Sequence, residues 1–277
     1  MGKSLVSSRE RLDEALVAAG LAENRSRAKR LILAGQVRVD GAPAGKPGSV
    51  VKAGAALEVA QANRYVSRGG DKLATPLTAS AIDPTGRVAL DAGASTGGFT
   101  DCLLQAGAIE VVAVDVGYGQ LAWTLRQDPR VHVLERTNAR NLAPTSLPDL
   151  VASPSILVMD LSFIGVAKVL PAVSALMAAG ADALILVKPQ FESSPADVEK
   201  GGVVRSGKVR SDALDQVAGA ARGLGWSVVG GHPSPLRGPA GNWECFLQLC
   251  LDNGATDRLD AVSAIDVPDD ALSGARP

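Results

Sequence analysis

Three charged residues lie directly beside apolar runs in the second half of the sequence. Lys188 follows the run at 183–187, Asp160 follows the run at 156–159, and Glu244 opens the last apolar run. Burial near a second cation favours the neutral amine of a lysine, which makes Lys188 a candidate general base. The competing interpretation is a lysine at a strand end whose ammonium reaches water. The first interpretation predicts proton abstraction in a crevice.

A glycine-rich turn follows the earlier apolar run at 88–90. Glycines between a strand and a helix let a ligand lie against backbone N–H groups, and the start of the helix favours negative charge. Asp91 precedes the first glycine, where it can meet the amino group of S-adenosylmethionine and would face no pyrophosphate. Asp115 lies 17 residues after Gly98, a position suited to ribose hydroxyls. These features favour S-adenosylmethionine over a dinucleotide, with a plain tight turn as the alternative.

The predicted cofactor site draws on the ends of three successive strands. Its last member, Asn138, follows the run at 131–134 and can reach the adenine. The full set is Asp91, Gly93, Ser95, Thr96, Gly97, Gly98, Phe99, Thr100, Asp115 and Asn138.

The group that accepts the methyl is predicted to be a hydroxyl. The chain holds no Pro-Cys dipeptide, so a thiol that attacks a cytosine carbon is not expected. The segment at 160–163 lacks the paired prolines of amino-group methyltransferases. A hydroxyl fits the remaining chemistry better than either alternative.

Apolar runs recur from residue 88 onward with helical stretches between them, as in a doubly wound α/β sheet. The carboxyl ends of such strands form the ligand crevice, so Asp160 and Lys188 are expected to meet there. The predicted strands lie at 88–90, 111–114, 131–134, 156–159 and 183–187, with two last strands at 226–229 and 245–250, the final one antiparallel.

A smaller module precedes this sheet. Helical spacing starts near Ser8 and ends at Gly20, and a second helix runs from Asn24 or Ser26 to Gly35. Short strands are predicted at 36–39, 49–51 and 56–59. The fold class is therefore α/β, a Rossmann-like S-adenosylmethionine-dependent methyltransferase fold with a small N-terminal α+β domain, which the family resemblance described below implies to be RNA-binding.

Charge is distributed unevenly along the chain. Residues 1–72 hold 13 Lys and Arg against 7 Asp and Glu, a balance of +6, whereas residues 73–277 hold 15 against 22, a balance of −7. A basic front end predicts a polyanionic partner, and a solvated basic face is the alternative. The cations expected to face the phosphates of such a partner are Arg9, Arg11, Arg25, Arg27, Lys29, Arg30, Arg38 and Lys46.

Several classes of protein are not expected from this composition. The three cysteines, Cys102, Cys245 and Cys250, form no even disulfide framework and no CxxC metal spacing, so we expect a reduced cytoplasmic protein without a metal. The N-terminus lacks the apolar stretch of a signal peptide. Charges interrupt the most apolar stretch, so no membrane span is expected.

Several long blocks of this sequence closely resemble the TlyA family. They span residues 64–73, 90–100, 114–121, 135–140, 160–164 and 187–192. The resemblance implies an N-terminal RNA-binding domain of the ribosomal-protein-S-four type and a C-terminal FtsJ-like Rossmann methyltransferase domain. It also implies methyl transfer from S-adenosylmethionine to the 2′-hydroxyl of cytidines in ribosomal RNA, of the large subunit and in some members also of the small one.

The same resemblance implies a Lys-Asp-Lys-Glu tetrad at Lys72, Asp160, Lys188 and Glu244. A ribose hydroxyl is a very weak acid, so a neutral Lys188 near the second cation Lys72 would take its proton during attack on the methyl. Asp160 and Glu244 would orient the two amino groups and the ribose. The presence of two lysines leaves open which of them is the base. Arg68 and Phe163 are expected to contact RNA, Phe163 by stacking on a base.

The expected organisation is an RNA-binding domain at 1–60, a linker at 61–66, a methyltransferase domain at 67–251 and a flexible tail at 252–277. The expected partner is ribosomal RNA or an assembled ribosomal subunit, and a monomer is expected. Two other functions stay open at this point. One is an RNA-binding factor that holds the cofactor without chemistry, and the other is a membrane-active hemolysin, a name that the family also carries.

Overall fold

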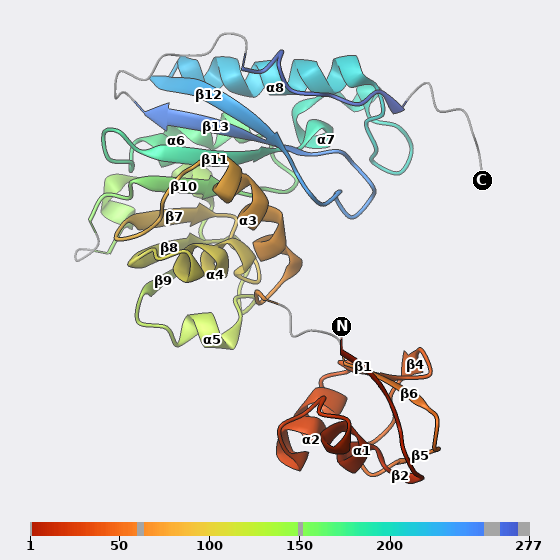
Figure 1. The fold of residues 1–277 in the computed structure, drawn as a ribbon. Coiled ribbons are helices and arrows are strands. Elements are labelled where there is room, and N and C mark those ends of the chain that lie inside the picture. Colours follow the sequence, from red (N-terminus) through yellow and green to blue (C-terminus); the bar gives the residue numbers. More distant parts are fainter. Residues whose placement is uncertain (1, 60–63, 149–151, 252–260, 271–277) are drawn as a thin grey trace. The chain divides into compact units, whose positions relative to one another are not determined.

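The computed structural model in Figure 1 describes residues 2–59, 64–148, 152–251 and 261–270 of the 277-residue chain. They form two compact units, Met1–Arg64 and Tyr65–Pro277. Tyr65, inside the expected linker, is buried in the core of the second unit. The backbone N–H of Val66 donates to Asp101 Oδ2 at 2.8 Å, so the second unit begins before the predicted residue 67. Positions 61–63 of that linker lie outside the described residues.

The first unit packs two helices against small antiparallel sheets. Asn24 caps the second helix, since its Oδ1 accepts the backbone N–H of Arg27 at 2.9 Å. Leu12, Leu16 and Leu57 are fully buried between the helices and the larger sheet. The helices are α1 (Leu12–Ala18) and α2 (Arg25–Leu33), and the strands are β1 (Gly2–Leu5), β2 (Glu10–Arg11), β3 (Val37–Val39), β4 (Ala42–Pro43), β5 (Val50–Val51) and β6 (Ala56–Val59).

The order of the larger sheet is β1-β6-β3-β4, and β2 pairs with β5. Both predicted helices and all three predicted strands of this module are confirmed. The structure adds β1, which pairs antiparallel with β6 from Gly2 opposite Val59 to Leu5 opposite Ala56. The four residues of β1 show no apolar alternation, so only their pairing with β6 defines the strand.

The second unit is built on a seven-stranded sheet. Its order is β12-β13-β11-β10-β7-β8-β9, with β13 antiparallel to both neighbours and the strands from β7 to β11 parallel. All seven predicted strands, including the antiparallel last one, are confirmed. Their bounds are β7 (Val88–Ala92), β8 (Glu110–Val114), β9 (Val131–Leu134), β10 (Ile156–Met159), β11 (Asp182–Val187), β12 (Trp226–Pro233) and β13 (Cys245–Leu251).

Helices cover both faces of this sheet (Figure 1). Successive residues of β10 point to opposite faces, so Val158 packs with one group of helices and Leu157 with the other. The first group is α3 (Arg68–Ala79), α4 (Gly98–Gln105) and α5 (Trp123–Arg126), and the second is α6 (Leu170–Ser174) and α8 (Gly207–Arg222). Short helical turns complete the unit: η1 (Ala139–Asn141), η2 (Pro144–Ser146), η3 (Val166–Lys168), α7 (Pro189–Glu192) and η4 (Pro195–Asp197).

Helix α3 approaches α4 unusually closely. A Cβ added to Gly98 at the start of α4 would lie 2.4 Å from Ser67 Oγ and 2.7 Å from the backbone nitrogen of Gly70. These distances are shorter than any van der Waals contact, so only glycine fits there. Ser67 caps α3 through its Oγ, which accepts the N–H of Gly69 at 3.3 Å. This contact between the two helices fixes the start of α3.

Part of the expected flexible tail is packed onto the second unit. Ala261, Val262 and Ile265 are buried in the core on the α8 side of the sheet, so this segment differs from the expectation. Burial of three apolar side chains outweighs the acidic composition of the surrounding segment. We call residues 261–270 the C-terminal strap. Across the described part of the chain, no helix is long and apolar enough to cross a membrane.

Candidate active site

Four charged side chains converge at one edge of the large sheet. Asp160 and Lys188 follow the parallel strands β10 and β11, so both emerge at the carboxyl edge. Because β13 is antiparallel, its first residues lie at that same edge, and Cys245 pairs with Val187. Glu244 and Lys188 are therefore neighbours across two adjacent strands. Lys72 reaches the group from the first turns of α3.

Opposite charges alternate along this tetrad. Lys188 Nζ lies 2.6 Å from Asp160 Oδ1, and Lys72 Nζ lies 3.9 Å from Asp160 Oδ2 and 2.8 Å from Glu244 Oε2. The Glu244 side chain is only 1% exposed, against 23% for Asp160. Two cations and two anions cancel formally, and each buried charge has an opposite partner that offsets its desolvation. The sequence-predicted catalytic residues thus form one connected group.

Ser162 belongs to the same cluster, although its residue type and position do not predict this. Its Oγ accepts a hydrogen bond from Lys188 Nζ at 3.2 Å. The serine and Asp160 together hold the amino group of Lys188. Serine at a strand exit is too common to identify such a contact before the fold is known.

Two adjoining cavities open at this edge of the sheet. One, of about 330 Å³, is lined by Asp115, Asn138 and Phe163, and we call it the Asp115 cavity. The other, of about 360 Å³, is lined by Arg68, Lys72, Lys188 and residues of the glycine turn, and we call it the lysine cavity. Both are lined by Gly93, Ser95, Asp160 and Ser162.

Hydrogen bonds join the glycine turn to Asp115 at the Asp115 cavity. Asp115 Oδ2 accepts the N–H of Ser95 at 2.8 Å, and its Oδ1 accepts the N–H of Gly117 at 2.6 Å. A carboxylate has further lone pairs, so Asp115 can also accept hydrogen bonds from two ribose hydroxyls. Gly93 has a φ of 92°, and a Cβ there would lie 2.3 Å from the carbonyl oxygen of Asp160. Glycine lets these two strand exits meet.

Asp91 lies beneath this turn and is fully buried. Thr100 Oγ1 donates to Asp91 Oδ2 at 2.6 Å, whereas Asp91 Oδ1 has no hydrogen-bond partner among the described residues. Burial raises the pKa of Asp91 from 3.8 to about 7, and the hydrogen bond from Thr100 opposes this rise. An unpartnered buried carboxylate oxygen is suited to receive a cationic group from a bound molecule.

The other predicted cofactor residues fall into two groups. Those that line one or both cavities are Gly93, Ser95, Thr96, Gly98, Phe99, Asp115 and Asn138. Those that line neither are Asp91, Gly97 and Thr100. Gly97 instead caps α4 with a φ of 93°, and Asn138 Oδ1 also accepts the N–H of Arg140 at 3.0 Å.

A pair of aromatic rings, Phe163 and the partly buried Phe191, borders Lys188. Phe163 is 92% exposed with a φ of 66°, and its ring centroid lies 5.6 Å from that of Phe191. Glu192 Oε1 accepts the N–H of Val166 at 2.7 Å, which ties the Phe163 loop to α7. Burial raises the pKa of Glu192 above its ordinary value. The sequence did not single out Glu192, because its partner is a backbone group from a distant loop.

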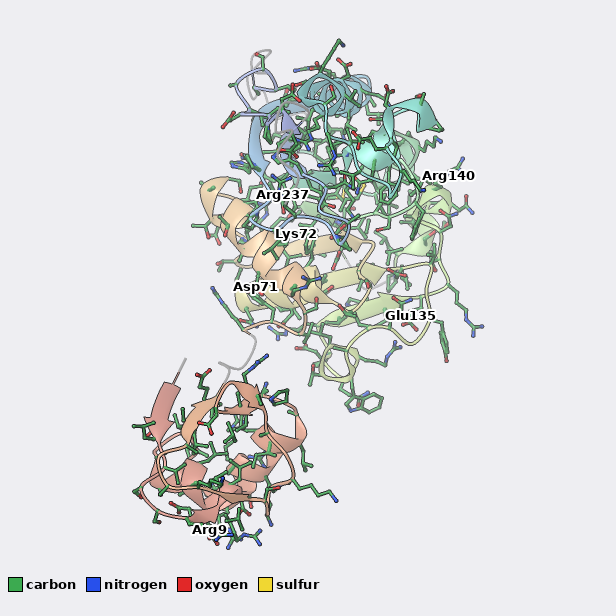
Figure 2. All side chains as sticks on the ribbon, turned by 90° about the vertical axis from the view of Figure 1, so that its right-hand side faces the viewer. Arg9, Asp71, Lys72, Glu135, Arg140 and Arg237 are labelled. Carbon is green, nitrogen blue, oxygen red and sulfur yellow. The ribbon has the colours of Figure 1, made fainter. Side chains whose placement is uncertain are left out.

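All eight predicted cations of the first unit are exposed. Two of them are held by one buried carboxylate: Arg11 Nε lies 3.0 Å from Asp13 Oδ1, and Arg25 Nη2 lies 3.3 Å from Asp13 Oδ2. Arg11 lowers the pKa of Asp13 from 3.8 to about 2. The guanidinium groups of Arg11 and Arg25 are thereby fixed on the surface beside α1. Arg9 lies at the edge of this unit in Figure 2.

Comparison with known proteins agrees with this geometry. The FtsJ-like methyltransferase family matches residues 65–251, and the S4 domain family matches residues 10–57. The "16S/23S rRNA (cytidine-2'-O)-methyltransferase TlyA" of Mycobacterium tuberculosis is 52% identical over 246 residues, which cover 88% of this chain and 91% of the relative. "Hemolysin A" of Brachyspira hyodysenteriae is 39% identical over 87% of this chain and its own whole length.

A solved structure supports the same assignment. A protein from Streptococcus thermophilus that carries the hemolysin name superposes with a TM-score of 0.70 at 36% identity, covering 93% of this chain and 95% of its own. The matches extend over both units of the chain. This chain therefore belongs to the TlyA family, in which an S4 domain precedes an FtsJ-like methyltransferase domain.

Proposed function

We propose that this protein transfers the methyl group of S-adenosylmethionine to the 2′-hydroxyl of cytidines in ribosomal RNA. The observation that carries the proposal is the alternating tetrad of Lys72, Asp160, Lys188 and Glu244 beside the Asp115 cavity. The Mycobacterium tuberculosis relative is named for the same reaction on the RNA of both ribosomal subunits. No observation on the described residues favours a non-catalytic factor or a hemolysin.

The residues of the Asp115 cavity fit S-adenosylmethionine. Asp115 would accept the ribose hydroxyls and Asn138 would meet the adenine. Asp91 lies beneath the glycine turn and outside the cavity lining, and its Oδ1 would receive the amino group, directly or through water. When bound, the cofactor supplies an electrophilic methyl group on a positively charged sulfur. The shared wall of the two cavities would place that methyl beside the lysine cavity, where the acceptor oxygen must approach in line.

The tetrad would manage the proton of the acceptor hydroxyl. Lys188 Nζ takes this proton as a neutral amine while the oxygen attacks. Lys72 Nζ lies between Glu244 and Asp160, so it holds the carboxylate of Asp160 that in turn contacts Lys188. After proton transfer, Asp160 stabilises the new ammonium at Lys188. Asp160 and Ser162 hold the Nζ in place throughout.

Two parts of the protein would bind the RNA. Exposed cations of the S4 domain would bind backbone phosphates, which makes binding dependent on salt. Arg68 at the lysine cavity and the exposed ring of Phe163 would contact the target nucleotide, the latter by stacking. The substrate is then ribosomal RNA, free or in an assembled subunit, and the protein acts in the cytoplasm with the ribosomes.

Transfer of labelled methyl from S-adenosylmethionine to unmethylated ribosomal subunits and to their free RNA tests the proposal. The wild type is expected to label RNA, and mapping should place the label on a cytidine 2′-oxygen. Lys188→Ala should lower the rate about 10²- to 10⁴-fold, since a general base contributes that much. Lys208→Ala is the matched control, because Lys208 is 80% exposed on α8, pairs with Asp212 across one turn and lines neither cavity.

Two results would contradict the proposal. Label on a base nitrogen or carbon would exclude ribose methylation. Absence of label on every ribosomal RNA, with cofactor binding demonstrated by calorimetry, would exclude these RNAs as substrates.

A further inference from the structure

Arg237 stands at the rim of the lysine cavity on the loop between β12 and β13. It lines this cavity together with Leu236 and Pro239, and Arg68 and Lys72 line the same cavity from α3. Figure 2 shows Arg237 and Lys72 on the same face of the methyltransferase unit. The side chain of Arg237 is 52% exposed. A cation therefore borders the place where the acceptor ribose must enter, and none of the roles proposed above uses it.

The loop that carries Arg237 is firmly held. The N–H of Gly238 donates to the carbonyl of Asn242 at 3.0 Å. Asn242 is itself buried, where its Oδ1 accepts the N–H of Val204 at 2.9 Å and its Nδ2 donates to the carbonyl of Gly202 at 2.7 Å. The backbone beside Arg237 is thus tied to a second loop. A fixed backbone with a half-exposed guanidinium is pre-organised for a ligand at the rim.

The guanidinium itself is held loosely. Arg237 Nη1 lies 3.4 Å from Asp270 Oδ2 of the C-terminal strap and 3.3 Å from the carbonyl oxygen of Gly241. The same Asp270 oxygen lies 2.6 Å from Nη2 of Arg210, a residue with no exposed surface. Asp270 therefore already neutralises a buried cation. Arg237 is left as a second, weakly paired cation on the same carboxylate.

We propose that Arg237 binds a backbone phosphate that flanks the methylated nucleotide, and that this phosphate replaces Asp270 as its partner. The inference rests on the proposed function. In RNA the carbon that bears the 2′-hydroxyl adjoins the carbon that bears the 3′-phosphate. A ribose whose hydroxyl reaches Lys188 therefore carries a phosphate within a few bonds of the rim. A planar guanidinium matches two phosphate oxygens, and its present contacts are long enough to be exchanged at small cost.

Methyl transfer measured against RNA concentration, at several salt concentrations, tests this role. Arg237→Gln is expected to raise the half-saturating RNA concentration about tenfold, the effect of one charged hydrogen bond, with the maximal rate retained. The slope of log affinity against log salt should fall by about one, because one phosphate contact is lost. Arg237→Lys should restore the slope while recovering only part of the affinity.

Arg130→Gln is the matched control. Arg130 is 47% exposed and pairs with Asp128 at 2.7 Å, but it precedes β9 at the opposite edge of the sheet and lines neither cavity. Its substitution should leave both quantities at wild-type values. Asp270→Asn keeps an oxygen acceptor for Arg210 but removes the charge that competes for Arg237. This variant should lower the half-saturating RNA concentration.

Three results would overturn the proposal. The first is an unchanged salt slope and half-saturation in Arg237→Gln. The second is a loss of maximal rate alone, which would indicate a structural role for the loop. The third is weaker RNA binding in Asp270→Asn. Failure of the wild type to methylate ribose would instead count against the proposed function, so the two failures are distinguishable.

Discussion

The amino group of Lys72 lies 2.8 Å from a carboxylate oxygen of Glu244, although 172 residues separate the two along the chain. Lys72 belongs to the first helix of the methyltransferase unit and Glu244 precedes its last strand. Glu244 is nearly completely buried and lines neither cavity, so its role is to hold Lys72. We interpret Glu244 as a positioning residue that keeps Lys72 from pairing fully with Asp160.

Glu244→Gln should therefore impair transfer without impairing cofactor binding. Lys72 would lose its nearest anion and pair more strongly with Asp160, which then holds Lys188 less well. We expect the single-turnover rate to fall about 10²-fold, the lower range for loss of acid-base function. Calorimetry should show S-adenosylmethionine affinity within a factor of about three of wild type. Asp128→Asn serves as the control, and equal rates for the two variants would contradict this role.

Asp91→Asn should change the pH dependence of stability. The folded pKa of about 7 exceeds the ordinary 3.8, so the folded protein retains a proton that the unfolded chain releases between these values. Asp91 therefore destabilises the wild type increasingly as the pH rises toward 7, and the substitution removes this penalty. The free energy of unfolding of Asp91→Asn should gain on the order of 2 to 3 kcal/mol over wild type between pH 5 and pH 8.

Urea unfolding followed by tryptophan fluorescence can measure this difference, since Trp123, Trp226 and Trp243 all lie in the second unit. A difference that stays constant with pH would contradict the raised pKa. In the same variant, S-adenosylmethionine should bind more weakly, because the proposed partner of its amino group has lost its charge.

Gly98→Ala should disturb the position of Lys72. The added methyl would lie 2.4 Å from Ser67 Oγ and 2.7 Å from the nitrogen of Gly70, so α3 must move away from α4. We expect a loss of about 1–3 kcal/mol in stability, as for other overpacked sites, together with slower methyl transfer. Gly219→Ala in α8 is the control, because its added methyl meets no atom within 4 Å among the described residues beyond its own helix backbone. That variant should gain up to about 1 kcal/mol.

Asp13→Asn should destabilise the S4 domain at neutral pH. The pKa of Asp13 is lowered to about 2 by Arg11, so its ionic contribution is complete above the ordinary value of 3.8 and is lost as the pH falls through 2. Arg11 and Arg25 are about half exposed, which limits the effect to about 1 kcal/mol. Hydrogen exchange at α1 and α2 should be faster in the variant at pH 7. Equal exchange rates there would contradict the assignment.

Most of the large sheet could be predicted because its strands are buried on both faces and so form continuous apolar runs. Helix α3 could not, since Gly69, Gly70 and Pro76 are all poor helix formers within its span. It is stabilised instead by Leu73 and Leu77, which pack with α4 and the sheet. Local helix propensity alone therefore does not predict α3.

Some residues of the candidate site could likewise be predicted from the sequence, and others could not. Asp160 and Lys188 could be selected because polar residues after buried strands must lie at the carboxyl edge. Lys72 was found only through the resemblance, because nothing local distinguishes it from its neighbours. Arg237 and Ser162 could not be predicted, because their positions depend on loops whose conformation no local sequence pattern specifies.

The insertion of β13 between β11 and β12 has a consequence for how activity is acquired. β13 is the last strand in sequence order but lies inside the sheet. Until it pairs, β11 and β12 each have an unpaired edge. The same strand delivers Glu244 to Lys72. Completion of the sheet and assembly of the tetrad are thus a single event. A chain that lacks β13 therefore has neither a closed sheet nor a complete tetrad.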